Sequence, residues 1–192
     1  GEFSYSNAGY VIAGAAIERI TGKPWEAAIS EHVFGPLAMA RAGFGPPLGD
    51  QPQGHVADAS GAFAPVGTGR GSDNPPAVGP AGTTHAMFED WAKFARVFID
   101  PAQTFLSPDS VQRLITPPAG QQYACGWGAL KHPVAGDTLA HTGSNNMWMA
   151  QVVLLKEHGA GLLTAMNAAG PRAEKAHRSV GNALTVSIAE GR

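Results

Sequence analysis

The sequence has few charges, a single cysteine and no long apolar run, and each shortage excludes a class of protein. Asp, Glu, Lys and Arg make up 15% of the 192 residues, and the formal net charge is −2. No basic patch suggests nucleic acid, and no polybasic arm suggests a membrane surface. One cysteine, Cys125, excludes an internal disulfide framework. No stretch of about 18 apolar residues is present, so no membrane span is expected.

Metal and cofactor signals are also scarce. The seven histidines are scattered, and no His-Glu-x-x-His motif or pair of cysteines suggests zinc. A glycine cluster at residues 67–71 lacks the Lys-Ser/Thr that a phosphate loop needs, and two prolines follow it. We therefore expect neither a metal nor a cofactor.

Glycine and proline, in contrast, are abundant, with 25 and 15 residues, and they predict many turns. Apolar periodicity predicts a series of helices, then strands, then one closing helix. This order predicts an α+β fold, in which helices flank an antiparallel sheet. The predicted helices cover about residues 7–20, 25–33, 87–99, 108–115 and 171–189, and the predicted strands cover 123–130, 138–143, 148–155 and 161–166.

Several local features carry more specific expectations. Asn7 is a candidate N-cap for the first helix, and the few charges of that helix predict that it is mostly buried. Cys125 lies in an apolar context, which favours a buried structural thiol. Residues 43–82 show little periodicity and predict a long loop, either a functional lid or binding wall, or a disordered segment.

Two polar segments could carry chemistry. The first is Tyr5-Ser6-Asn7, in which a phenol and an amide two residues apart can point into one cleft. The second is His141-Thr142-Gly143-Ser144, next to an apolar run that predicts a buried strand. A core tyrosine before a capping asparagine explains the first segment about as well, and a histidine on a strand is more often structural.

The two segments and their surroundings together resemble the serine β-lactamase and penicillin-binding-protein superfamily, with the class C β-lactamase-like group as the closest branch. The resemblance covers most of the chain and keeps its order. It implies a β-lactamase/transpeptidase-like fold with the family elements Ser-x-x-Lys, Tyr-x-Asn and Lys-Thr-Gly. The matching stretches are residues 3–10, 18–24, 34–39, 80–90, 123–127 and 141–167.

The resemblance implies a role for each polar residue. Tyr5 would shuttle the proton of the nucleophile, and Asn7 would hold the substrate amide. His141 would occupy the lysine position, and Thr142 and Gly143 would line the cleft. The backbone N–H of Ser144 would be one oxyanion donor. A histidine there resembles a D-alanyl-D-alanine carboxypeptidase branch, and it differs from lysine because an unperturbed imidazole is mostly neutral at pH 7.

One family element is missing, because no serine in the sequence is followed by lysine three residues later. In the family, that nucleophile precedes the Tyr-x-Asn element. We therefore expect residues 1–192 to be the C-terminal portion of one domain, incomplete at its N-terminus, with residues 1–120 mostly helix and loop and 121–192 holding the strands and last helix. The possible partner is an N-terminal segment of the same fold. Ser6 and Ser144 are poor substitute nucleophiles, because alternation turns them away from Tyr5 and His141.

The leading hypothesis is part of a serine acyl hydrolase that works through an acyl-enzyme on a β-lactam, a D-amino-acid peptide or an ester. The chain alone is expected to be inactive. The alternative is a non-catalytic penicillin-binding-like module that binds a peptide or a partner. The resemblance favours a periplasmic or secreted location, although no export signal is visible.

Overall fold

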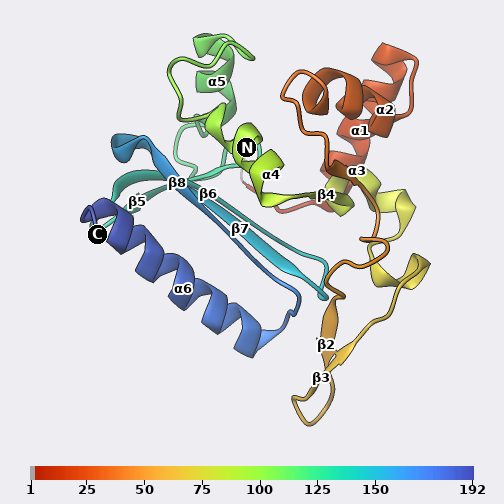
Figure 1. The fold of residues 1–192 in the computed structure, drawn as a ribbon. Coiled ribbons are helices and arrows are strands. Elements are labelled where there is room, and N and C mark those ends of the chain that lie inside the picture. The colour runs from red at the N-terminus through yellow and green to blue at the C-terminus, as the bar shows by residue number, and fades with distance from the viewer. Residues whose placement is uncertain (1–2) are drawn as a thin grey trace.

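The computed structural model describes residues 3–192, except for the side chain of Arg70. A four-stranded antiparallel sheet forms the centre of one lobe, and a helical lobe lies beside it (Figure 1). The strands follow the chain order β5-β6-β7-β8, each paired with the next. The α+β prediction is therefore confirmed. The strands are β5 (Gly128–His132), β6 (Gly136–Ser144), β7 (Met149–Leu155) and β8 (Ala160–Met166).

Helices cover both faces of this sheet. The long helix α6 (Pro171–Ala189) lies along one face, and α4 (Phe88–Arg96) and α5 (Pro108–Ile115) lie on the other side (Figure 1). The strand β7 is paired on both edges, so its near-continuous apolar sequence packs on both faces. The main core lies between the sheet and α4. Its buried residues are Ala95, Val97, Phe98, Ile115, Trp127, Leu139, Val152 and Leu154.

The helical lobe contains the first part of the chain. It comprises α1 (Asn7–Thr21), α2 (Trp25–Ile29), a π-helical turn (Ser30–Phe34), α3 (Gly79–Gly82) and the pair β1 (Ala42–Phe44) and β4 (Thr84–Ala86). Trp25 packs edge-on against Phe44, with ring centroids 4.7 Å apart. Gly14 of α1 permits the approach of α3, because a Cβ there would lie 2.4 Å from Cγ of Pro80.

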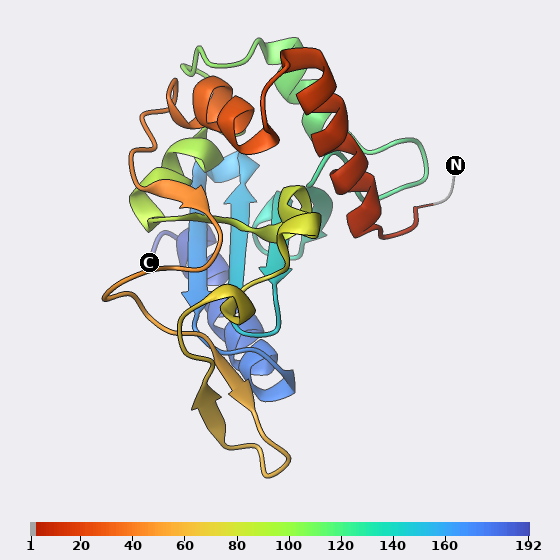
Figure 2. The same cartoon turned by 90° about the vertical axis from the view of Figure 1, so that its right-hand side faces the viewer.

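The long segment predicted at residues 43–82 contains only short elements. A hairpin of β2 (His55–Ala57) and β3 (Phe63–Pro65) projects at the foot of the molecule (Figure 2). Two short 3-10 turns follow the hairpin within the segment, Arg70–Ser72 and Pro76–Val78. Outside this segment, a third 3-10 turn, Lys156–His158, joins β7 to β8. The start of the β2–β3 hairpin contacts the sheet lobe, where the backbone N–H of His55 donates to the carbonyl of Met147 at 3.1 Å.

Several local predictions are wrong. The N-cap of α1 is Ser6, whose hydroxyl accepts from the backbone N–H of Gly9 at 3.2 Å, and not Asn7. The helix α1 is mostly exposed, because it lies at the rim of its lobe and only Gly14 is buried. Cys125 is exposed, since the neighbouring Trp127 enters the core in its place. Residues 123–127 form a turn and not a strand, because Gly126 has a φ of +81°.

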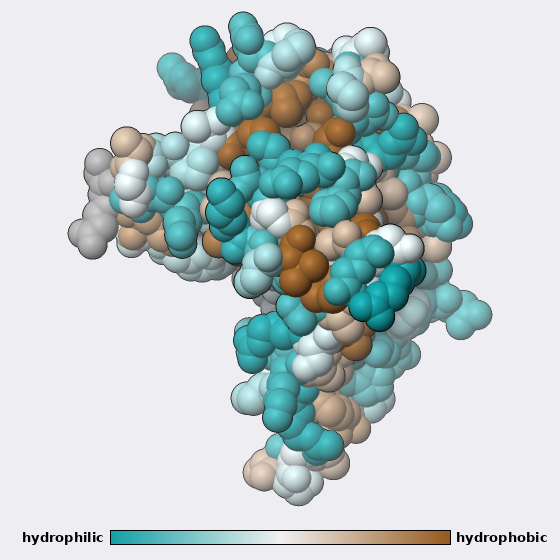
Figure 3. All heavy atoms as spheres, turned by 90° about the vertical axis from the view of Figure 1, so that its left-hand side faces the viewer, coloured by the Kyte–Doolittle hydropathy of each residue, from teal (hydrophilic) through white to brown (hydrophobic). Residues whose placement is uncertain are grey.

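The surface is mainly hydrophilic where α5, β5 and the end of α6 lie, with small apolar patches between polar side chains (Figure 3). Exposed apolar side chains in the sheet lobe include Leu130, Val134, Val180 and Leu184. Within residues 3–192, no helix is both long and apolar enough to cross a bilayer.

Candidate active site

The His141 segment forms the end of β6, where one edge of the strand is open. β5 pairs with β6 only as far as Gly128 opposite Ala140, and β7 covers the other edge up to Ser144 opposite Met149. Residues 141–144 are all exposed. Alternate residues on such an edge direct their N–H and C=O groups outward, so this part of β6 can offer backbone hydrogen bonds to a ligand.

Alternation along β6 separates its side chains into two sets. His141 lies opposite Val152, on the face of the sheet that packs against α4, whereas Thr142 lies opposite Gln151, on the face covered by α6. Gly143 has open space around its missing side chain. His141 and Gly143 therefore share one face of the strand, and Thr142 borders that face through its backbone.

A rigid turn at residues 123–127 lies over the His141 ring. The carbonyl oxygen of Gly126 is 2.7 Å from Nδ1 of His141, and the Tyr123 hydroxyl is 3.1 Å from the same nitrogen. The turn is anchored by Trp127, which is 5% exposed and packs against Phe98 of the core. The backbone N–H of Cys125 also donates to the carbonyl of Leu114 at 3.1 Å.

Tyr123 connects this turn to the start of the chain. Its ring contacts Phe3, with centroids 5.0 Å apart. Burial raises the pKa of Tyr123 to about 12, with further contributions from Tyr10 and then Tyr5. The phenol of Tyr123 therefore stays protonated at ordinary pH.

The Tyr5 segment completes this group of side chains. The Tyr5 hydroxyl donates to Oδ1 of Asn7 at 2.8 Å, and Tyr5 is close enough to influence the Tyr123 phenol electrostatically. Tyr5 is 75% exposed and Asn7 is also exposed. The fold thus brings Tyr5, Asn7 and His141 to one side of the molecule, with Tyr123 between Tyr5 and His141.

The turn after β6 is held by the long segment. The side-chain amide of Asn145 donates to Asp73 at 2.9 Å, and its Oδ1 accepts from the backbone N–H groups of Met147 and Trp148. The Ser144 hydroxyl donates to the carbonyl of Trp148 at 2.8 Å and accepts from the N–H of Asn146. The Ser144 side chain is thus part of the turn, which leaves only its backbone for the predicted oxyanion role.

Two residues in this site were given no role from the sequence. Tyr123 and Gly126 were noted only as part of a stretch that resembles the last strands of the family. The sequence contains two weak indications of this turn: Tyr123 lies three residues before Gly126, and Trp127 follows Gly126 directly. Their position over His141 depends on how the turn folds back, which periodicity does not report.

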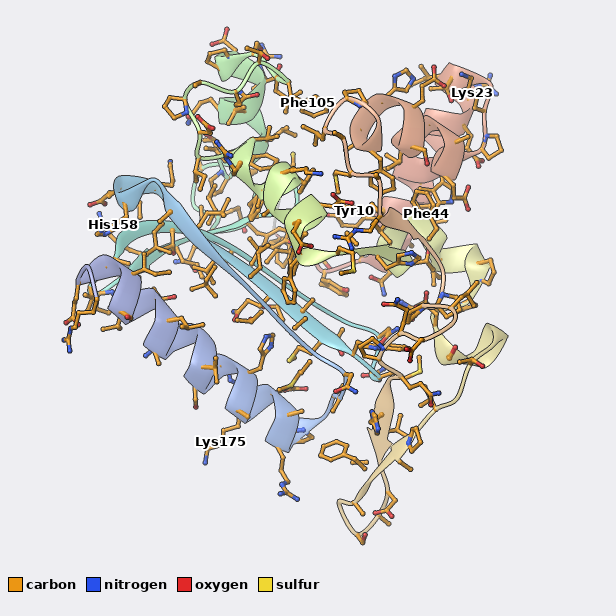
Figure 4. All side chains as sticks on the ribbon, in the orientation of Figure 1. Tyr10, Lys23, Phe44, Phe105, His158 and Lys175 are labelled. Carbon is orange, nitrogen blue, oxygen red and sulfur yellow. The ribbon has the colours of Figure 1, made fainter. Side chains whose placement is uncertain are left out.

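A separate hollow of about 650 Å³ lies away from these residues, near Phe105 (labelled in Figure 4). Its apolar lining includes Leu37 and Val97. Its charged side chains already have partners: Arg96 pairs with Asp100 at 2.6 Å, and Lys93 pairs with Asp90 at 2.7 Å. The hollow therefore has no evident group to bind or transform a ligand. In residues 3–192, no group of three His, Cys, Asp or Glu side chains could hold a metal ion.

The fold is that of the penicillin-binding and β-lactamase class of proteins. The model of the Beta-lactamase family matches residues 1–186, so the chain belongs to that family. The class C branch stays a prediction. No curated protein matches the sequence closely enough to count as a relative.

Solved structures share this fold at low sequence identity. The octameric penicillin-binding protein homologue from Pyrococcus abyssi is 22% identical, with a TM-score of 0.76 over 96% of this chain and 43% of its own. The D-amino acid amidase from Ochrobactrum anthropi SV3, complexed with L-phenylalanine amide, is 20% identical, with a TM-score of 0.77 over 98% of this chain and 56% of its own. A penicillin binding protein from Bacillus halodurans is 17% identical, with a TM-score of 0.77 over 95% of this chain and 56% of its own. The chain thus spans about half the length of these proteins.

Proposed function

We propose that the chain is the C-terminal part of a serine acyl hydrolase that forms an acyl-enzyme on a β-lactam, a D-amino-acid peptide or amide, or an ester. The observation that carries this proposal is the meeting of two distant polar segments: Phe3, two residues before Tyr5, packs on Tyr123, and the Tyr123 hydroxyl contacts His141. Membership of the Beta-lactamase family supports the reaction class. The amidase among the similar structures supports a D-amino-acid substrate as one option.

Each residue has a role in this proposal. The Tyr5 phenol relays the proton of the attacking hydroxyl, and the Asn7 side chain holds the substrate amide. His141 and Gly143 border the bound substrate, and the backbone of Thr142 lies between them. The N–H of Ser144 stabilises the oxyanion, which is a role that a fixed backbone donor on an open strand edge can fill.

The attacking serine is the part that this chain does not supply, since it contains no Ser-x-x-Lys. We propose that an N-terminal segment of the same fold provides it. Such a segment would have two surfaces to cover. One is the outer edge of β8, which is unpaired along residues 160–166 in the described part of the chain, and the other is the set of exposed apolar residues on α1, including Ile12 and Ile20. A periplasmic or secreted location belongs to this proposal.

The test compares purified Gly1–Arg192 with the product of the complete gene. Both are incubated with a chromogenic lactam, a D-amino-acid anilide and an aryl ester, and covalent adducts are detected by intact mass. We expect the complete protein to form an adduct, and Tyr5→Phe in that protein to slow acylation by about a hundredfold or more, the usual size of a lost general base. We expect the 192-residue chain to be silent.

Hydrolysis by the 192-residue chain, with its mass verified, would contradict the proposed origin of the nucleophile. A complete protein that binds these substrates without ever forming an adduct would favour the non-catalytic binding module. The absence of Ser-x-x-Lys from the chain is the observation that keeps this second function open.

A further inference from the structure

The surroundings of the His141 ring determine which of its two nitrogens carries the proton. A neutral imidazole has one N–H donor and one bare acceptor nitrogen. The nitrogen Nδ1 lies 2.7 Å from the carbonyl oxygen of Gly126, and this oxygen can only accept. A bare Nδ1 would place two lone pairs against each other at that distance, so Nδ1 must be the donor.

The position of the Tyr123 hydroxyl is consistent with a proton on Nδ1. This hydroxyl lies 3.1 Å from Nδ1 of His141, and burial raises the pKa of Tyr123 to about 12, so the phenol keeps its proton. A hydroxyl oxygen can accept a hydrogen bond while it keeps its own proton. The Tyr123 oxygen then has lone pairs free to accept from Nδ1–H. Both neighbours of Nδ1 are therefore acceptors.

The turn that carries the Gly126 carbonyl has hydrogen bonds of its own. The N–H of Ala124 donates to the carbonyl of Trp127 at 2.8 Å, and the N–H of Gly126 donates to that of Ala124 at 2.9 Å. Trp127 is fixed in the core. The acceptor is thus prearranged, and the histidine ring adapts to it.

We infer that the turn at residues 123–127 fixes His141 as the Nδ1–H tautomer and presents its Nε2 as a bare hydrogen-bond acceptor, with Tyr123 as a positioning residue. His141 is exposed, and within residues 3–192 no hydrogen bond to Nε2 is recorded. A lysine at this position could only donate. While the imidazole is neutral, the substrate group that meets Nε2 is therefore a donor, such as an amide NH₂.

The tautomer can be measured on the chain itself, without activity. In long-range ¹H–¹⁵N spectra of protein labelled at histidine, at a pH where the imidazole is neutral, we expect a pyrrole-like Nδ1 and a pyridine-like Nε2 for His141. His141→Gln assigns the signal among the seven histidines. A pyrrole-like Nε2 would overturn the inference whatever the protein catalyses.

Two substitutions separate the contributions of the turn. Gly126→Ala places a side chain at a φ of +81° and should displace the carbonyl, so that the preference for Nδ1–H falls by about tenfold, the weight of one hydrogen bond. Gly159→Ala is the matched control, because its φ is +56° in a turn outside the site, with open space around it. Tyr123→Phe keeps the ring and removes one acceptor, so the preference should fall less than in Gly126→Ala. Equal spectra for Gly126→Ala, Tyr123→Phe and the control would contradict the positioning role.

The donor preference is the step that rests on the proposed function, and it has its own readout. An N-acetyl D-amino acid amide and the corresponding acid are titrated into the complete protein, and the Nε2 shift of His141 is followed. We expect the amide to move this signal and the acid to leave it unchanged while the imidazole is neutral. An acid that moves Nε2 equally, or an amide that does not, contradicts the preference. Acyl-enzyme formation, measured separately, decides the proposed function.

Discussion

The two polar segments of the site are held in very different ways. His141 lies on a strand that is paired with β7 as far as Ser144, under a turn anchored by a buried tryptophan, and the next turn is tied to Asp73. Tyr5 precedes an exposed helix, and its hydroxyl donates to Asn7, only two residues away. Aromatic contact through Phe3 and Tyr123 is what joins the two segments.

The difference indicates how the site is organised. The sheet lobe contains its own core and can position His141 with residues of this chain. The position of Tyr5 depends on a helix that buries little of its surface. A disturbance of the sheet should therefore unfold the protein, whereas a disturbance of α1 should act locally.

The largest expected effect comes from a cavity in the sheet. Leu154 of β7 is 1% exposed and belongs to the main core, so Leu154→Ala should lower the free energy of unfolding by about 3 kcal/mol. Ile12 of α1 is 69% exposed, and Ile12→Ala should change the free energy of unfolding by less than about 0.5 kcal/mol. Urea unfolding of both variants measures the contrast. Similar losses for the two would show that α1 and the sheet are equally important for stability.

The next effect is expected at the link between the two lobes, where Asp90 of α4 is 4% exposed. The hydrogen bond from Lys93, and then that from the backbone N–H of Arg41, hold the pKa of Asp90 below its ordinary value of 3.8. A lowered pKa means that Asp90 stabilises the fold above pH 3.8, and that this contribution is lost as the pH falls through the folded-state pKa.

Asp90→Asn should therefore be less stable than the parent at neutral pH, and the difference in their free energies of unfolding should disappear in acid. Chemical unfolding of both proteins across a pH series tests this. Asp109→Asn is a suitable control, because Asp109 is an exposed residue in the first turn of α5. If the stability difference between Asp90→Asn and the parent does not change with pH, the carboxylate charge is not what links the lobes.

A smaller effect is expected at the turn after β6. Asn145→Ala removes the bond to Asp73 and leaves the N–H groups of Met147 and Trp148 without their side-chain acceptor, at a cost of about 1–2 kcal/mol. Hydrogen exchange at these two amides should become faster, while exchange in the middle of β7 changes less. Unchanged exchange at Met147 and Trp148 would show that the Asn145 side chain does not hold this turn.

The smallest effect is expected at the start of α1. Ser6→Ala removes the N-cap and should cost about 1 kcal/mol within the helix, seen as faster exchange of the Gly9 amide. Global unfolding should change little, because α1 is peripheral. Ser107→Ala removes the equivalent cap of α5, which packs on the core through Ile115, and it should lower global stability more. Equal global effects would remove the contrast between the regions.

Sequence patterns were informative wherever the physical cause is local. The order of helices and strands follows from apolar periodicity, because the residues that set it lie within a few positions of one another. The predictions for α1 and Cys125 were wrong because burial depends on what packs against a segment, and apolar composition alone does not reveal that neighbour.

The sequence by itself determined the α+β architecture, the two polar segments and the absence of a Ser-x-x-Lys. Only the tertiary structure placed Tyr123 between Tyr5 and His141, and only it brought the Gly126 carbonyl to Nδ1 of the histidine. The reason is that propensity and periodicity act over a few residues. The contacts that set the chemistry of His141 join residues 15 or more positions apart, and their geometry is fixed by a turn whose anchor, Trp127, is buried in a core assembled from both α4 and the sheet.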